Sequence, residues 1–334
     1  MVFNRFFFGA SAQHSQFCLR AATAEVAEGR LGPRLSIWLI AFFAALSSAQ
    51  MAIALGWLDV SESRQLVATG TMSGAIIGGL MFGTGMILAR GCASRLLVLT
   101  ATGNLRALIT GLVLTLVAQS ALRGALSPIR EVLASLWVVQ GGIDRNLLAQ
   151  LGLTSGSAAL VSVAALCAAL IHSRHNSVPT NHAIAAFAVG LAVTLGWLGT
   201  YSISTHSFEV VAVSSITFTG PATDTLMVLV NSPQLKFGFG FGLVPGVLLG
   251  ASAMALLTGT AKIQRFEQDT PMETYLIGAV FMGFGSMLAG GCAVGAGISG
   301  GAIFSLTAWV AVANMWIGAM VTHRLIKSGS LLPA

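Results

Sequence analysis

Two cysteines that lie 200 residues apart occupy the same place in two near-copies of one glycine-rich segment. The first copy is GTGMILARGCA at 83–93, which contains Cys92, and the second is GFGSMLAGGCA at 283–293, which contains Cys292. Seven of the eleven positions are identical, including a Leu-Ala pair and a Gly-Cys-Ala triplet at constant spacing. This match predicts an internal repeat with a cysteine at its centre.

The glycines of each copy predict a helix that is interrupted inside an apolar environment. Each glycine weakens a helix by roughly 1 kcal/mol relative to alanine and allows close backbone approach. After the interruption we expect short helical segments at 94–100 and 294–298, before turns at 102–104 and 299–301. The first N–H groups of such segments carry a partial positive charge, so each interruption predicts an anion site.

The residues beside the cysteines fit a soft, sulfur-bearing anion. A thiol is a weak hydrogen-bond donor with a polarizable sulfur, and in apolar surroundings it stays protonated and does not repel an anion. Arg90 and Arg95 flank Cys92, whereas Gly290 replaces the first of them in the second copy. We therefore expect Arg95 and the backbone at Gly91 and Gly291 to contribute to binding.

A weaker similarity extends the repeat toward the N-terminus. Phe17-Cys18 aligns with Phe218-Thr219 at an offset of 201 residues, so that Thr219 stands where Cys18 stands. The offset agrees with that of the cysteine pair. Each half is expected to contribute two thiol or hydroxyl positions to one centre.

The composition identifies the chain as a polytopic all-α membrane protein. In 334 residues, 55% are hydrophobic and 8% are charged, which excludes an ordinary soluble globular protein. We expect about 8–10 transmembrane helices. Shorter apolar stretches at 129–139 and 208–230 are ambiguous. Apolar runs of spanning length occupy eight ranges: 35–58, 66–88, 105–122, 147–171, 183–198, 235–257, 275–289 and 302–321.

The positive charges predict the orientation of the spans. The net charge is +6, but lysine and arginine gather at span ends, which fits the positive-inside rule and argues against nucleic-acid binding. The basic loops are Arg20–Arg34, His172–His182, Lys262–Glu273 and His323–Lys327. With these in the cytoplasm, the spans leading to the two cysteines enter from opposite faces.

We therefore predict one transmembrane domain, 1–334, made of two pseudo-symmetric and inverted halves with broken helices at the centre. The first half is about 1–140 and the second about 180–334, joined by a connecting helix at about 147–171. The four cysteines include no C-x-x-C pair, and no histidines stand at metal-ligand spacing, so we expect neither a metal nor a cofactor. Cys167, in an alanine-rich run, is interpreted as a packing residue.

At these residues the chain resembles the YeeE/YedE family of membrane proteins, a thiosulfate-transporter-like group. The resemblance covers most of the chain and is carried by four motifs: Phe17-Cys18 with Ala21-Ala22, Gly91-Cys92-Ala93-Ser94-Arg95, Thr219-Gly220-Pro221-Ala222 and Gly291-Cys292-Ala293-Val294-Gly295. It implies an hourglass-shaped protein of the bacterial inner membrane that passes thiosulfate along cysteines at its waist. By residue correspondence these are Cys18, Cys92 and Cys292. Some relatives work beside a small sulfurtransferase-like cytoplasmic protein.

The leading hypothesis is therefore a permease, embedded in membrane lipid, for a small sulfur-containing anion. Thiosulfate is the expected cargo, and we do not expect an enzyme. The substrate-binding candidates are Cys18, Cys92, Cys292, Arg95, Gly91, Gly291 and Thr219. A membrane redox or sulfur-transfer subunit with a persulfidated cysteine is the alternative, and a scaffold without transport is a third possibility. The sequence leaves open the energy source and the choice between thiosulfate, selenium species and other sulfur anions.

Overall fold

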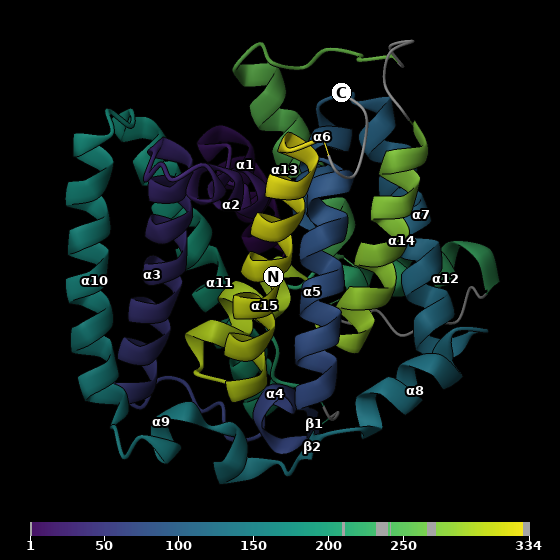
Figure 1. Ribbon diagram of the computed structural model, residues 1–334. Helices are drawn as coiled ribbons and strands as arrows, with labels where there is room; N and C mark the ends of the chain where they lie inside the picture. The colour runs from purple at the N-terminus through teal and green to yellow at the C-terminus, as the bar shows by residue number, and fades with distance from the viewer. Residues whose placement is uncertain (1, 209–210, 232–239, 241, 266–271, 330–334) are drawn as a thin grey trace.

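The computed structural model describes residues 2–208, 211–231, 240, 242–265 and 272–329, which form a bundle of upright helices (Figure 1). Seven segments of the described chain are helical, long and apolar enough to cross a membrane. The shorter apolar helix α13 stands beside them. The chain is a multi-pass α-helical membrane protein.

The helices and strands of the described residues are numbered in chain order. In the first part of the chain they are α1 Val2–Ser15, α2 Leu19–Ala27, α3 Pro33–Ala54, α4 Arg64–Val67, β1 Gly70–Thr71, α5 Met72–Leu88, α6 Ala93–Ala101, α7 Leu105–Arg123, α8 Ser127–Ser135 and β2 Val138–Val139. In the second part they are η1 Gly142–Arg145, α9 Leu147–Gln150, α10 Ser155–His175, α11 Thr180–His206, α12 Thr219–Asn231, α13 Leu243–Leu257, α14 Met272–Leu288, η2 Ala293–Gly300 and α15 Leu306–Lys327.

Most expected spans correspond to single helices, with two differences. The span expected at 66–88 begins only at Met72, because α4 and a two-stranded β1–β2 ladder come first. The connecting helix expected at 147–171 is split into α9 and α10, with Gly152 between them at a φ of 65°. Parts of the expected span 235–257, the stretch 208–230 and the basic loop 262–273 lie outside the described residues.

The two cysteine-bearing copies meet along helices α5 and α14, which are antiparallel. A Cβ atom at Gly78 would lie 2.6 Å from the carbonyl oxygen of Gly285, and one at Gly85 would lie 2.5 Å from that of Gly278. These pairs place residues of rising number on α5 against residues of falling number on α14. Glycine is therefore required here because the two backbones touch.

The same pattern of packing occurs twice around this central pair. Helix α5 packs against α15, and α14 packs against α7; likewise α1 packs against α13, and α11 packs against α3. Each of these contacts has a counterpart when α1, α3, α5 and α7 are exchanged with α11, α13, α14 and α15. Helix α10 lies at the periphery against α3 (Figure 1).

One end of the bundle, which we call the basic end, gathers the loops that were expected in the cytoplasm. Arg324 Nε donates to the carbonyl oxygen of Ala27 at 3.1 Å, and Lys327 Nζ lies 3.6 Å from Glu28 Oε1. The rings of His14 and His182 are 5.4 Å apart. The elements α4, α8, α9, β1 and β2 lie at the opposite end (Figure 1).

An extended segment, 211–218, runs back into the bundle after α11. Its backbone polar groups are satisfied by side chains: Thr200 Oγ1 donates to the carbonyl oxygen of Ser214 at 2.6 Å, and Ser299 Oγ to that of Ile216 at 2.6 Å. Within a membrane, non-helical backbone is tolerated only where protein surrounds it or where it lines a polar cavity. This segment is therefore non-helical backbone that the surrounding helices enclose.

Candidate functional site

Both cysteines of the repeat sit at the N-terminus of the helix that follows the interruption. Cys92 is the residue before α6 and Cys292 the residue before η2, so the expected segments 94–100 and 294–298 are present in slightly longer form. Each cysteine is 1% exposed. The two thiols therefore lie inside the bundle beside helix N-termini, as the anion-site prediction requires.

The chain reaches these cysteines through the same turn in both copies. Arg90 and Gly290 adopt the left-handed conformation, with φ values of 53° and 79°. The next residue then makes the hydrogen bond that caps the C-terminus of the preceding helix. The Gly91 N–H donates to Met86 O at 3.1 Å, and the Gly291 N–H donates to Ser286 O at 2.9 Å. Gly91 and Gly291 thus terminate α5 and α14 and direct the chain to the cysteines.

The second copy is more constrained than the first. The Gly295 N–H points at Cys292 Sγ at 3.5 Å, and the Gly295 carbonyl oxygen accepts from Gln65 Nε2 at 3.2 Å. Cys92 Sγ instead lies 3.3 Å from Ser94 Oγ. Segment η2 is a π-helix, a conformation that is rare and concentrated at functional sites.

Gly295→Ala is expected to disturb the Cys292 site. A methyl group there would overlap Thr217 Oγ1, so η2 or the extended segment must move and the sulfur must shift. We expect a strong loss of substrate uptake at near-normal protein abundance, measured by labelled-substrate uptake and immunoblotting. Gly111→Ala, whose added Cβ meets nothing within 4 Å, is the control. Normal uptake by Gly295→Ala would contradict this geometry.

The other two members of the expected centre stand at the starts of short helices. Cys18 precedes α2 and is half-buried, and Thr219 begins α12 with a buried Oγ1 that has no hydrogen-bond partner. The first helical bonds run from Ala22 N to Cys18 O and from Ala222 N to Phe218 O. By this comparison, Phe218 and not Thr219 is the structural counterpart of Cys18 in the repeat. The offset is 200 residues, one less than the sequence comparison suggested.

The fold places Cys92 near two of the other cysteines and leaves Cys167 apart from them. Cys92 is a neighbour of both Cys18 and Cys292. Arg95, on α6, is half-buried with an Nη1 that has no hydrogen-bond partner. Cys167 is exposed on α10, a peripheral helix, so it stands apart from this centre on the surface of the bundle.

A polar cavity of about 520 Å³ opens at the end of the bundle that carries α4 and α8. We call it the vestibule. Its walls are α4, β1, α8, η1, the end of α14 and the extended segment 213–217. Gly290 and Thr217 line it, and Thr217 is the residue that would meet a Cβ at Gly295. The vestibule thus approaches Cys292 from outside the bundle.

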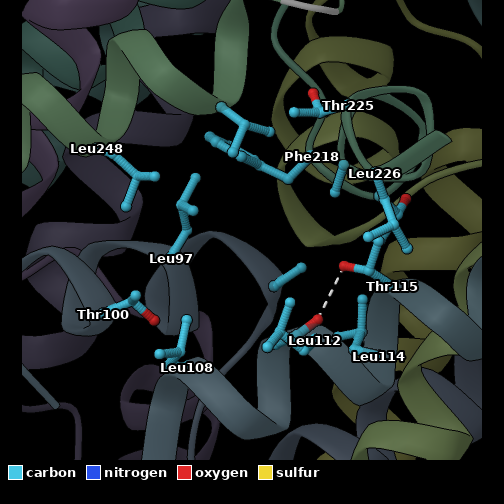
Figure 2. A pocket seen from close by; sticks show the side chains of 15 residues that line it. Leu97, Thr100, Leu108, Leu112, Leu114, Thr115, Phe218, Thr225, Leu226 and Leu248 are labelled. Carbon is cyan, nitrogen blue, oxygen red and sulfur yellow. Dashed lines mark hydrogen bonds between the residues drawn. The ribbon is translucent and has the colours of Figure 1, made fainter. Parts of the chain in front are cut away.

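A second pocket of about 210 Å³ lies beside α6 and is almost wholly apolar. Figure 2 shows leucine side chains around it, among them Leu97, Leu108 and Leu112, and the Thr115 hydroxyl donates back to Gly111 O at 2.8 Å. Thr219 contributes to its wall. An anion would lose its hydration here without replacement, so this pocket is unsuited to a charged substrate.

Sequence reasoning did not identify Arg145, Gln65 and Trp197, which line the vestibule. None belongs to the repeated segment, and Arg145 lies in a short connection without periodicity. Its neighbour Asn146 pairs with Ser305 across the fold. No group of His, Cys, Asp or Glu able to hold a metal occurs among the residues that were described.

Comparison with known proteins adds two findings. The family model described as Sulphur transport matches residues 14–321. A protein named thiosulfate transporter TsuA from Spirochaeta thermophila is 28% identical over 267 residues, which cover 75% of this chain and 78% of that protein. The thiosulfate transporter TsuA of Escherichia coli is 24% identical over 280 residues, covering 76% and 74%. The relatives are transporters by name, in agreement with the expectation that this chain is not an enzyme.

Proposed function

Because this chain belongs to the sulphur transport family, we propose that it is a permease of the bacterial inner membrane that takes thiosulfate into the cell. The observation that carries the proposal is the burial of Cys92 and Cys292, each 1% exposed, at paired helix N-termini. Such a site offers soft thiol donors and backbone N–H groups to an anion. The names of the relatives support thiosulfate as the cargo.

The path runs from the vestibule to Cys292, then to Cys92 and finally to Cys18. Each neutral thiol donates an S–H hydrogen bond to the anion and hands it to the next, and no covalent step is needed. The first backbone N–H groups of α6 and η2, to which Gly91 and Gly291 direct the chain, and the guanidinium of Arg95 offset the charge of the anion. Thr219, whose buried hydroxyl has no partner, is a further donor for the anion at the start of α12.

Two inverted halves, about 1–140 and 180–334, form this path. The antiparallel contact of α5 with α14 and the paired contacts of α5 with α15 and α14 with α7 support this arrangement. The halves deliver one half-helix from each end of the bundle toward the cysteines. The expected connecting region, now α9 and α10, belongs to neither half.

The basic end faces the cytoplasm and the vestibule faces outward. The basic end carries Arg30, Arg34, Arg174, Lys262, Arg265, Arg324 and Lys327, as the positive-inside rule predicts. At the opposite end of the bundle taken as a whole, four arginines balance four acidic residues: Arg64, Arg123, Arg130 and Arg145 against Asp59, Glu62, Glu131 and Asp144. A small sulfurtransferase-like protein that receives thiosulfate would meet the basic end, while lipid surrounds the exposed apolar side chains of α7 and α10.

Growth on thiosulfate tests the proposal. A sulfur-auxotrophic bacterium that lacks other thiosulfate and sulfate carriers should grow with thiosulfate as its only sulfur source when it expresses this chain. It should not grow with the empty vector, and growth on cysteine should be equal in both strains. Equal growth on thiosulfate with and without the chain, at verified membrane expression, would refute the proposed cargo.

A further inference from the structure

The vestibule contains a buried positive charge with no carboxylate partner. Arg145 is 7% exposed, and its guanidinium donates to two neutral oxygens, Ala68 O at 2.5 Å and Thr307 Oγ1 at 2.6 Å. Its Nε has no partner. Within the described ranges no carboxylate lies in ion-pair contact with Arg145. A buried cation without a counter-ion is costly unless a ligand supplies the negative charge.

The remaining charges of the vestibule do not neutralise Arg145. Three arginines and one glutamate line the cavity, and the glutamate, Glu131, is paired with Arg130 at 3.1 Å. Arg64 is exposed at the wall. Burial lowers the pKa of the Arg145 guanidinium, and the charge of Arg64 lowers it further, but a guanidinium remains protonated at neutral pH. The cavity is therefore electropositive.

A second donor faces the same cavity. Trp197 is 1% exposed, lines the vestibule, and its indole Nε1 has no hydrogen-bond partner. Indole N–H groups donate and cannot accept, so a ligand that satisfies both Trp197 and Arg145 must present hydrogen-bond acceptors. The unsatisfied donors and the positive charge together favour an anion with several acceptor atoms, such as an oxyanion.

The vestibule also complements an asymmetry in the repeat. Arg90 and Arg95 flank Cys92, whereas glycine stands at both equivalent positions, Gly290 and Gly295, in the second copy. The charge that is missing beside Cys292 is present across the cavity at Arg145 and Arg64. Positive potential therefore exists on both sides of the cysteine pair.

We propose that the vestibule is an oxyanion-binding antechamber, in which Arg145, Arg64 and the Trp197 N–H bind a small divalent oxyanion before it reaches Cys292. This inference rests on the proposed transport function, which sets the direction in which the anion moves from the vestibule to Cys292. It adds that recognition has two stages: the antechamber selects charge and oxygen acceptors, and the thiols select sulfur. Sulfate, which has the oxygens but no terminal sulfur, should thus bind in the antechamber without being carried.

The test measures sulfate binding and thiosulfate uptake separately. Sulfate should change the tryptophan fluorescence of the purified full-length protein in detergent in a saturable way, and should inhibit thiosulfate uptake competitively. Arg145→Gln should weaken sulfate binding by about tenfold or more and raise the KM for thiosulfate by a similar factor, because a hydrogen bond to a charged group is lost. Arg64→Gln and Trp197→Phe should act in the same direction with smaller effects.

Arg123→Gln, at the exposed end of α7 and outside the vestibule lining, is the matched control and should leave both values unchanged. Because Arg145 also holds Ala68 and Thr307, the exposed Arg64 tests the antechamber independently of folding. Sulfate binding without any thiosulfate transport would refute the transport function and leave the antechamber standing. Normal transport with no sulfate binding, or with equal effects of Arg64→Gln and Arg123→Gln, would overturn the antechamber.

Discussion

Alanine at Cys92 or Cys292 is expected to reduce thiosulfate uptake by about 10- to 100-fold. A hydrogen bond to a charged partner contributes about 1.5–3 kcal/mol, and each factor of ten corresponds to about 1.4 kcal/mol. Both thiols are buried at helix N-termini, so water cannot replace the lost donor. The measurement is the initial rate of labelled thiosulfate uptake, normalised to protein in the membrane.

Two further variants define what the thiols do. Cys167→Ala should transport normally, because this cysteine is exposed on α10. Serine at Cys292 should give an intermediate rate, since it keeps a donor but loses the large polarizable sulfur. Full uptake by both Cys92→Ala and Cys292→Ala would rule out the relay. A persulfide on either cysteine during turnover, detected by mass spectrometry, would instead support the sulfur-transfer alternative.

Adding a methyl group at the contact between α5 and α14 is expected to have the largest effect on stability. A Cβ at Gly78 would lie 2.6 Å from both Ala289 N and Gly285 O. These are backbone atoms that cannot rotate away, so Gly78→Ala should force the helices apart and cost about 1–3 kcal/mol. Gly285→Ala, which would meet the Gly78 carbonyl oxygen at 2.7 Å, should behave in the same way.

Gly111→Ala provides the opposite expectation. It lies inside α7 with open space around it, so alanine should stabilise the helix by about 0.5–1 kcal/mol. Thermal unfolding of the detergent-purified protein compares the three variants. A similar increase in melting temperature for all three would show that the α5–α14 contact is looser than the structure has it.

The sequence predicted the parts of the site that depend on local chemistry. Glycine before each cysteine ends a helix, and the segments expected at 94–100 and 294–298 correspond to α6 and η2 within two residues. The class of fold followed from hydrophobic run length. The π-helical form of η2 was not predicted, because its residues Gly295 and Ser299 make contacts with Gln65 and Ile216, which are distant in sequence.

The vestibule could not be predicted for a related reason. Arg145 and Thr307 are 162 residues apart in the chain, and only the fold brings their side chains together. The extended segment 211–218 is rich in valine, isoleucine, threonine and phenylalanine, which favour extended backbone, but its path through the bundle is set by Thr200 and Ser299. The sequence locates a repeated local motif, whereas a cavity lined by several connections requires the tertiary structure.

The central claim is that thiosulfate crosses the membrane past two neutral thiols. Its most direct test is uptake of labelled thiosulfate by proteoliposomes that contain only this purified protein, compared with its Cys92→Ala/Cys292→Ala variant. We predict saturable accumulation by the wild type and uptake close to that of empty liposomes for the variant. Equal accumulation by both proteins, with the variant correctly folded by thermal unfolding, would contradict the claim.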